Sequence, residues 1–356
     1  MKIQTMRYTF CISIIAALTL TSISTAQTVD TIAPDPPEVL SQITPEGAVA
    51  TQAATTDSWG GKTVAQWTER LADPDRRVRW YAVYALGKIG PASASSVEQL
   101  AALIADFKQY EYVRGGAAWA LGRIGPRSAA AVPVLTDSLG STLLSVRRNA
   151  ALALGHIGEA AKPAVARLTE VLQDKDAEVR INAAASLWRI EQNPGAMHVL
   201  LTYVAHTEGA GPFLAAKALG TLDGAPRETV VPALVTALGH PQSDVRRAAA
   251  RSLGQIGADS LAGLRGAMQN SDVTIRLTAI EALGWIGAAG IDDLAAALKD
   301  TDARVRLRAA REIGRNAKSA GSTAVNDALV DATADADLRV RDEAVRALRL
   351  IRESNP

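Results

Sequence analysis

Apolar and small residues recur at a fixed helical spacing along most of the chain. Counted from a Val or Ile that precedes an Arg, they fall at positions 0, +4, +7, +8 and +11, as in Val78, Ala82, Ala85, Leu86 and Ile89. At about 100° per residue these positions share one face of a helix. The pattern predicts an amphipathic helix with one buried face, and no stretch alternates as a strand would.

The pattern repeats at intervals of 30 to 35 residues, and a shorter Leu-spaced helix precedes each copy, as with Leu135 and Leu139. The clear copies begin at Val78, Val113, Val146, Val179, Val245, Ile275, Val305 and Val340, and a degenerate copy has Gly211-Pro212 in place of Val-Arg. One helix pair cannot bury its apolar face alone, so neighbouring pairs must stack. The sequence predicts an all-α fold, an α-solenoid of nine two-helix repeats.

Residues at the ends of the predicted helices have local roles. Pro133, Pro163 and Pro232 fall in first turns, where a missing N–H is tolerated. The glycine of each Leu-Gly pair supplies close packing or a helix stop. An Asp three residues before the Val is a natural N-cap, as at Asp75, Asp176, Asp272, Asp302 and Asp337.

The motif Asp-x-x-Val-Arg-x-x-Ala-x-x-Ala-Leu-Gly-x-Ile-Gly resembles the bacterial HEAT-like repeat first associated with phycobilisome lyases. The resemblance spans Lys62 to Ile351. It implies a superhelix whose second helices line the concave side, and it is poorly specific for function. Some HEAT-like hydroxylases hold two irons with His-Glu motifs, but no histidine here is followed by Glu.

The N-terminus indicates export. Lys2 and Arg7 precede an apolar run, and Ser24-Thr25-Ala26 resembles a cleavage site, so residues 1–26 are predicted to be a signal peptide. Residues 27–61 read as a Thr/Ala/Pro-rich disordered spacer, 62–352 as the solenoid and 353–356 as a tail. Cleavage would remove the sole cysteine and leave no stable membrane span. Periplasmic or secreted localisation follows, and export disfavours a chromophore lyase.

Charge and site chemistry point away from catalysis. Losing two cations with the signal lowers the formal net charge from +1 to −1, so bulk charge favours neither nucleic acid nor membrane. The four histidines stand in no metal-binding spacing, and Gly-Lys-Thr at 61–63 lacks the earlier glycine of a phosphate-binding loop. We therefore expect no catalytic residue, metal or cofactor. Trp67 is predicted to be core.

One arginine recurs beside the buried face of each regular repeat. Its place at the edge of that face favours a structural ladder, in which a guanidinium bonds a neighbouring Asp or helix-end carbonyls, over a ligand-binding ladder. The ladder comprises Arg79, Arg114, Arg147, Arg180, Arg246, Arg276, Arg306 and Arg341.

The positions opposite the core, +2, +6 and +10, predict a basic concave strip with aromatic anchors at its N-terminal end, near Tyr81 and Tyr112. Aromatic and Arg side chains are enriched at binding hot spots, and a basic groove attracts acidic partners. The candidate partner-binding residues are Trp80, Tyr84, Lys88, Trp119, Arg123, Arg148, Arg189, Arg247, Arg251, Arg311 and Arg315. Ordinary solvent-facing cations and aromatic packing between repeats are the alternative interpretation.

These features predict a non-enzymatic scaffold that binds a protein with an acidic surface or extended segment. An acidic-glycan-binding solenoid and an accessory subunit of an exported enzyme complex are the alternatives, and export disfavours nucleic acid. The irregular fifth repeat, residues 206–212, is either a hinge or drifted sequence. The oligomeric state does not follow from the sequence.

Overall fold

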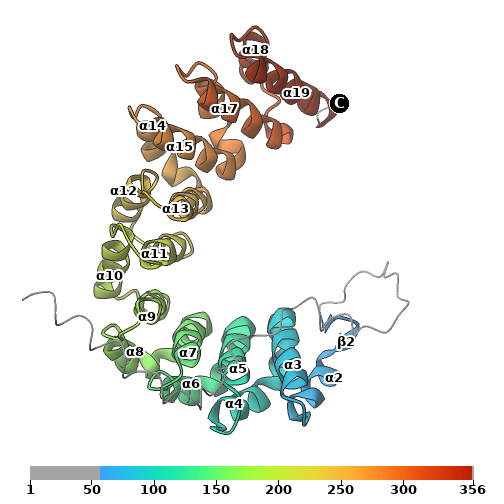
Figure 1. The fold of residues 1–356 in the computed structure, drawn as a ribbon, viewed down its shortest axis with the longest axis vertical. Coiled ribbons are helices and arrows are strands. Elements are labelled where there is room, and N and C mark those ends of the chain that lie inside the picture. The colour runs from blue at the N-terminus through green and yellow to red at the C-terminus, as the bar shows by residue number, and fades with distance from the viewer. Residues whose placement is uncertain (1–56, 355–356) are drawn as a thin grey trace, which may run out of the picture. The chain divides into compact units, whose positions relative to one another are not determined.

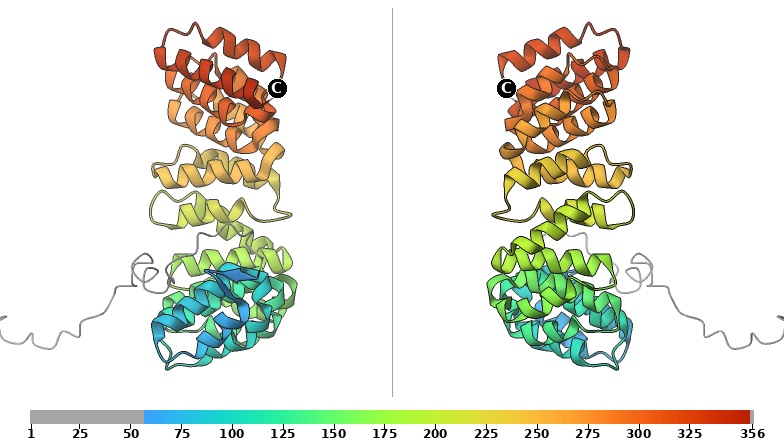
Figure 2. Two further views of the ribbon diagram at one scale, coloured as in Figure 1. Left: turned by 90° about the vertical axis from the view of Figure 1, so that its right-hand side faces the viewer. Right: turned by 90° about the vertical axis from the view of Figure 1, so that its left-hand side faces the viewer.

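Consecutive helices pair antiparallel along the chain, and each pair packs on the next. The computed structural model describes residues 57–354, which lie in one unit of the chain, Ala54–Pro356. Those residues contain nine helix pairs, from α2–α3 to α18–α19, arranged in two layers (Figures 1 and 2). The predicted all-α solenoid of two-helix repeats is therefore confirmed.

The second helix of each pair lies on the inner side of the stack in Figure 1, and we call these the inner helices. They are α3 (Arg76–Ile89), α5 (Glu111–Ile124), α7 (Leu144–Ile157), α9 (Ala177–Glu191), α11 (Gly211–Leu219), α13 (Ser243–Ile256), α15 (Val273–Ile286), α17 (Ala303–Arg315) and α19 (Leu338–Ser354). The eight helices with a Val-Arg or Ile-Arg pair, together with α11 of the degenerate copy, form the inner layer that the resemblance implied.

The first helices form the outer layer. They are α2 (Val64–Glu69), α4 (Val97–Ala105), α6 (Val132–Ser138), α8 (Val165–Val171), α10 (Pro194–Val204), α12 (Arg227–Ala237), α14 (Leu261–Met268), α16 (Ile291–Ala297) and α18 (Thr323–Ala332). Short 3-10 segments join or extend the helices: η1 (Arg70–Ala72), η2 (Gly90–Ser96), η3 (Gly125–Ala131), η4 (Gly158–Ala164), η5 (Gly257–Ser260), η6 (Gly287–Gly290) and η7 (Ala317–Ser319).

The core lies between the two layers and between successive inner helices. Ala82, Ala85 and Leu86 of α3 are fully buried, as the spacing predicted, and Leu135 of the outer helix α6 is fully buried as well. Alanine is small enough for neighbouring helices to approach closely, while leucine fills the space between the layers. The sequence pattern thus sets both the helices and their packing.

Glycine has two separate roles at the ends of the inner helices. The glycine after Ile ends the helix with a positive φ, 73° at Gly90 and 78° at Gly257, which favours glycine. The glycine after Leu permits close packing, because a Cβ on Gly122 would lie 2.9 Å from Cα of Ala153 in the next repeat. Both predicted roles are therefore present, at different positions.

The five predicted aspartate caps are confirmed, since each carboxylate accepts a backbone N–H in the first turn of its helix. At Asp337 the carboxylate also pairs with the Arg339 guanidinium at 2.8 Å. That side-chain bond, followed by the backbone bond from Arg339, lowers the pKa of Asp337 to about 2. The cap therefore stays charged well below the pH at which an ordinary aspartate is protonated.

Acid is expected to destabilise the solenoid through this cap. A carboxyl pKa that is lower in the folded state contributes stability above the ordinary value of about 3.9, and that stability is lost as the pH falls towards 2. The thermal unfolding midpoint of Asp337→Asn should therefore fall less between pH 4 and pH 2 than that of the unchanged protein. Circular dichroism measures both, and equal falls would contradict this account of the cap.

The repeated arginine fixes the loop of its own repeat and contacts the next repeat. In α17, Arg306 donates from Nη1 to the backbone oxygen of Asp300 at 2.8 Å, and from Nε and Nη2 to Asp335 of the last repeat at 2.7 and 2.9 Å. Comparable links to the next repeat join Arg79 to Gln109, Arg147 to Asp174, Arg180 to Tyr203 and Arg276 to Asp300. These bonds support the structural interpretation of the ladder.

The other three ladder arginines bond backbone carbonyls within their own repeat. Arg114 donates to Ile104, Arg246 to His240 and Pro241, and Arg341 to Asp335. In the fifth repeat, α11 begins at Gly211-Pro212 and contains no such arginine, so the ladder is interrupted there. Whether this interruption acts as a hinge stays a prediction.

Two local expectations were wrong. Strands Ser58–Trp59 (β1) and Lys62–Thr63 (β2) form an antiparallel pair, because Gly60 and Gly61 both adopt the positive φ of a tight hairpin turn. Residues 57–61 of the predicted spacer therefore belong to folded structure, and the rest of it, with residues 1–26, lies outside the described residues.

The second wrong expectation concerns a proline. Pro232 lies within α12 rather than in its first turn, because the helix already begins at Arg227.

Candidate protein-binding surface

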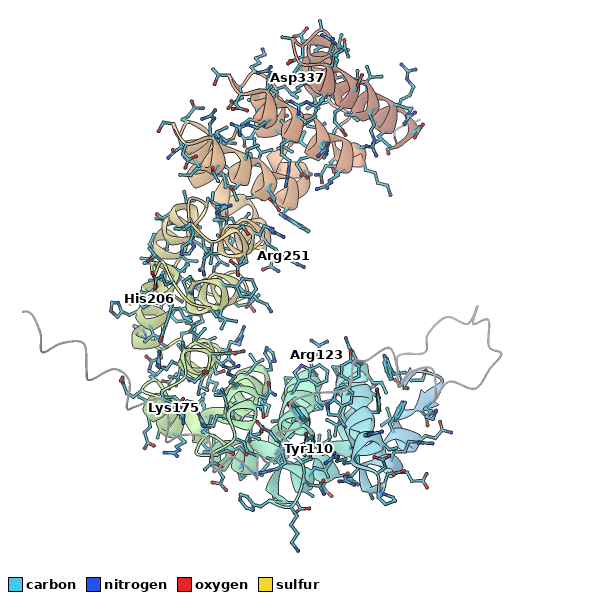
Figure 3. All side chains as sticks on the ribbon, viewed as in Figure 1. Tyr110, Arg123, Lys175, His206, Arg251 and Asp337 are labelled. Atoms are coloured by element: carbon cyan, nitrogen blue, oxygen red, sulfur yellow. The ribbon has the colours of Figure 1, made fainter. Side chains whose placement is uncertain are left out.

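All eleven candidate binding residues lie on inner helices, from α3 to α17. Figure 3 shows the side chains of Arg123 and Arg251 on the inner side of the stack and Lys175 near the outer layer. The helical period that puts the core residues on one face of each inner helix puts these candidate side chains on the opposite face. Their surroundings differ from repeat to repeat.

The aromatic candidates form one stack across the first two repeats. The ring of Tyr84 lies between Trp80 and Trp119, with centroid distances of 5.6 and 5.7 Å and interplanar angles of 12° and 13°. Trp59 of the hairpin meets Tyr84 edge-on at 5.6 Å. Each of the three stacked rings is only partly buried. They therefore pack against one another and still present ring surface on the inner side.

The stack depends on a glycine. A Cβ on Gly87 would lie 2.2 Å from a ring carbon of Trp119, so only glycine lets this indole cross α3. Trp67 is buried as predicted, and its indole N–H donates to the backbone oxygen of Trp59 at 3.0 Å. Tyr81, expected near the strip, is buried, with only 4% of its surface exposed. The stack thus comprises Trp80, Tyr84 and Trp119.

A row of basic side chains follows the stack at position +10 of the first four repeats. Lys88, Arg123, His156 and Arg189 occupy the last turns of α3, α5, α7 and α9, where the helix dipole favours positive charge. Arg189 donates to the Thr221 hydroxyl at 2.9 Å, and its Nη1 is buried without a hydrogen-bond partner among the described residues. This row contains no carboxylate.

His156, within this basic row, is kept neutral by burial and by two neighbouring arginines. Burial is the first cause that lowers the pKa of His156 to about 4, followed by the positive charges of Arg189 and Arg123, and a hydrogen bond with the Gly122 backbone opposes them. The folded pKa is below the unfolded value of about 6.5, so protonation favours unfolding as the pH falls from 6.5 towards 4.

We expect an NMR titration of His156 with a midpoint near 4, which rises in Arg189→Gln because one repelling charge is removed. His198, which is exposed, serves as the reference in the same spectra. A His156 midpoint near the ordinary value, or one unchanged by Arg189→Gln, would contradict the proximity of the basic row.

Three of the predicted cations are paired with acids. Arg148 contacts Asp176 at 2.8 Å and Glu178 at 2.7 Å in the next repeat. Arg311 lies 3.6 Å from Glu343, and Arg315 lies 3.0 Å from Glu312. Their charges are largely compensated within the protein, so the basic character of the inner side lies mainly between α3 and α13. The acids that pair with these arginines lie on neighbouring turns or in the next repeat. They are not at positions +2, +6 or +10, so the strip pattern alone could not predict these ion pairs.

A groove between α11 and α13 gathers the remaining candidates. Arg247 and Arg251 project from α13, and Lys217 from α11 faces them across a space of about 540 Å³. Phe213, Thr221, Asp244 and Gln255 also line it. Lys217 was on the predicted strip but was not singled out as a candidate; the structure brings it into the same groove as the two arginines.

The fourth repeat departs from the predicted surface. Ile181 and Ala185 of α9, expected opposite the core, are only 1% and 3% exposed. The cause is local, because Gly211 at the start of α11 lies against Ile181 and Tyr203. The irregular fifth repeat thus covers part of α9, and it separates the basic row on the helices before it from the groove between its own α11 and the following α13.

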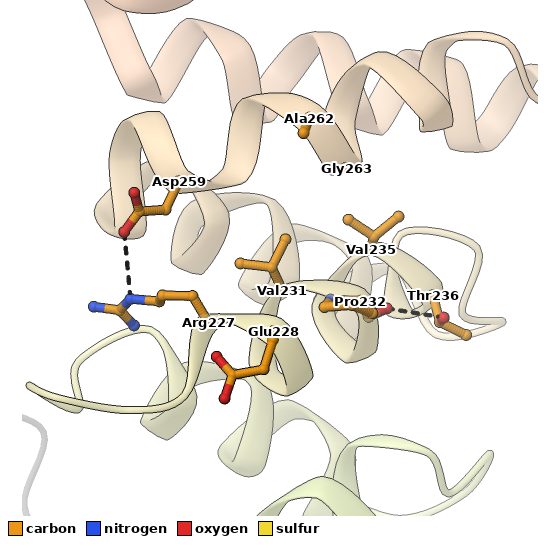
Figure 4. Close-up of a pocket in the computed structure, with 9 residues that line it drawn as sticks. All are labelled: Arg227, Glu228, Val231, Pro232, Val235, Thr236, Asp259, Ala262 and Gly263. Carbon is orange, nitrogen blue, oxygen red and sulfur yellow. Dashed lines mark hydrogen bonds and ion pairs between the residues drawn. The ribbon is translucent and has the colours of Figure 1, made fainter.

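A second groove lies on the outer layer between α12 and α14 (Figure 4). Val231, Val235 and Pro232 form its apolar wall, and Arg227 lies 3.8 Å from Asp259 at one end. Its one cation, Arg227, is therefore balanced by two carboxylates, those of Asp259 and Glu228. It contains no cluster of like charge.

Metal-ligating side chains do not gather within residues 57–354, where no group of three or more His, Cys, Asp or Glu residues could hold an ion. His240 is buried and bonds the His206 backbone oxygen at 2.7 Å, a local structural role. No helix in the described part of the chain is long and apolar enough to cross a bilayer.

The stacked helix pairs and the ladder between them define an α-solenoid of tandem two-helix repeats. The profile of HEAT repeats matches residues 64–155, 144–212 and 199–284, and that of the PBS lyase HEAT-like repeat matches residues 275–300. The chain therefore belongs to the HEAT-repeat family.

Solved structures share this architecture at low identity. Yeast importin-β (Kap95p) is 16% identical, with a TM-score of 0.50 over 82% of this chain and 45% of its own. Human deoxyhypusine hydroxylase with bound glycerol is 24% identical, with a TM-score of 0.33 over 82% and 96% of the two chains. The likeness to importin-β concerns the fold alone. No curated protein sequence is significantly similar to the chain.

Proposed function

We propose that this protein is a non-enzymatic scaffold that binds an acidic partner protein along its inner surface. The observation that carries the proposal is a set of inner cations that form no ion pair with any described residue, although arginines elsewhere in the fold do. They are Lys88, Arg123, Lys217, Arg247 and Arg251, whereas Arg189 lies within reach of the Asp223 charge. Uncompensated charge on one side of a solenoid attracts and orients a partner of opposite charge.

The aromatic stack adds contact area at the N-terminal end of this surface. Its rings are held by their mutual stacking, so binding would cost little side-chain entropy there. Trp and Tyr beside cations are the residue types that dominate binding hot spots. The stack and the basic row together would suit an extended acidic segment that runs across several repeats.

The cellular setting in this proposal comes from the sequence. A signal peptide at residues 1–26 would place the scaffold in the cell envelope or outside the cell, where an exported enzyme complex is one source of the partner. An acidic glycan remains the alternative partner class. Retention on a sulfated polymer that falls steeply with salt, without selection for any protein, would favour the glycan.

A charge-matched pair of variants tests the proposal. Lys88→Gln with Arg123→Gln removes two inner cations, and Lys175→Gln with Lys299→Gln removes two exposed cations from loops outside the basic row. The tagged full-length chain should retain its native partner about tenfold less in the first variant than in the second, as measured by quantitative mass spectrometry. Equal retention in both variants would contradict a role for the inner surface.

A further inference from the structure

We infer that the groove between α11 and α13 is a subsite for two carboxylates of an extended acidic peptide segment. The inference rests on the proposed function and specifies where one partner segment binds. Three cations line the groove, Lys217, Arg247 and Arg251, against one carboxylate, that of Asp244. Asp244 accepts a hydrogen bond from the backbone of Val245 at 2.9 Å, which holds one of its oxygens at the start of α13.

A tryptophan of the next repeat orients Arg251 for binding a carboxylate. Its guanidinium lies over the ring of Trp285 from α15, with 5.3 Å between its central carbon and the ring centroid. This cation–π contact uses no N–H group as a hydrogen-bond donor to an acid, so the guanidinium can still offer its N–H edge to a planar carboxylate, which accepts two parallel hydrogen bonds. No described side chain supplies that carboxylate.

The support for this arrangement is a close contact between helices. A Cβ on Gly254 would lie 2.3 Å from Cβ of Trp285, so glycine at this position lets α15 bring the indole beside α13. Trp285 remains 54% exposed, unusually open for a tryptophan. Exposure that packing does not require is consistent with an aromatic platform that a bound segment covers.

The floor of the groove is fixed by a second close contact. Ser252 of α13 donates to the backbone oxygen of Ala216 in α11 at 2.8 Å, and Gly220 leaves room for it. Because this bond joins the two helices, the groove walls are held in place before a ligand arrives. A preformed site loses less entropy on binding.

The spacing of the cations indicates an extended segment. Arg247 and Arg251 are one helical turn apart on α13, a rise of about 6 Å. Side chains on one face of an extended chain are about 7 Å apart at residues i and i+2. Two acidic residues separated by one residue would therefore match the two arginines, with Lys217 facing them from α11.

The test uses a fluorescein-labelled peptide, Gly-Ser-Glu-Thr-Glu-Ser-Gly, and the full chain in fluorescence anisotropy. We expect Arg251→Gln to raise the Kd about tenfold or more, and the charge-matched control Lys175→Gln to change it less than about twofold. Trp285→Leu, which keeps every charge, should weaken binding by an intermediate factor. The same peptide with Gln in place of both Glu residues should not bind measurably.

Three results would overturn the subsite: equal effects of Arg251→Gln and Lys175→Gln, equal binding of the Glu and Gln peptides, or no effect of Trp285→Leu. Thermal unfolding of each variant shows whether lost binding reflects lost folding, and Arg251→Lys, which keeps the charge but not the planar fork, should bind more weakly than the unchanged chain even if fully folded. If the native partner still depends on Lys88 and Arg123 while these results fail, only the subsite is wrong.

Discussion

Gly155→Ala is expected to destabilise the solenoid by about 2 kcal/mol. This is the opposite of the usual effect, since alanine in a helix interior is normally more stable than glycine by about 1 kcal/mol. The reason is the next inner helix. A Cβ on Gly155 of α7 would lie 2.8 Å from Cα of Ser186 in α9 and 2.3 Å from its hydroxyl oxygen. Backbone atoms cannot move aside as a flexible side chain can, so the two repeats must separate.

The matched control is Gly266→Ala in α14. Gly266 is exposed and helical, and a Cβ there would meet no atom within 4 Å. The same substitution should therefore stabilise the protein by up to about 1 kcal/mol. Urea unfolding followed by circular dichroism measures both variants, and the expected changes in midpoint have opposite signs. A Gly155→Ala variant as stable as Gly266→Ala would show that α7 and α9 are not this close.

Arg306→Gln is expected to cost about 3 kcal/mol, because it leaves the Asp335 carboxylate without its bidentate guanidinium and two backbone carbonyls without a donor. The Arg306 and Asp335 side chains are 15% and 9% exposed, so water replaces these bonds poorly. Arg304→Gln is the control, since its ion pair with Asp302 is on the surface and should contribute less than about 1 kcal/mol.

The pH dependence gives this second prediction a distinct signature. The bond from Arg306 is the first cause that lowers the pKa of Asp335. Its stabilising effect is therefore complete above the ordinary carboxyl pKa and is lost as the pH falls through the lower folded value. The difference between Arg306→Gln and the unchanged protein should shrink in that range. A difference that stays constant down to pH 2 would show that the ion pair is not its source.

Local sequence periodicity predicted the helices because each one obeys rules contained within about fifteen residues. The buried face of α3, the caps at Asp75 and Asp176 and the terminating glycines follow from residues close along the chain. Contacts between repeats were harder to predict. Asp174, Asp300 and Asp335 pair with the ladder arginines, and the Asp-x-Asp spacing ahead of four of the Val-Arg copies, those at Val78, Val179, Val305 and Val340, was the available signal.

The candidate surface illustrates the same limit. Periodicity placed Trp80, Arg148 and Arg251 on the second helices of their repeats, and they lie on the inner helices α3, α7 and α13. It could not show that Arg148 meets Asp176 and Glu178, or that Trp285 stacks on Arg251, because those neighbours belong to the following repeat. Which basic side chains are free to bind a partner therefore depends on contacts between repeats, which only the structure shows.

Position-specific photo-cross-linking in the native cell tests the proposed scaffold most directly. A photoreactive residue would replace Lys88, Arg123 or Lys217 on the inner helices, and Arg167 or Lys175 in or beside α8 of the outer layer, one position per variant. The account predicts that inner positions cross-link to the same acidic protein and that outer positions do not. Cross-links to that protein from Arg167 and Lys175 but not from the inner helices would contradict it.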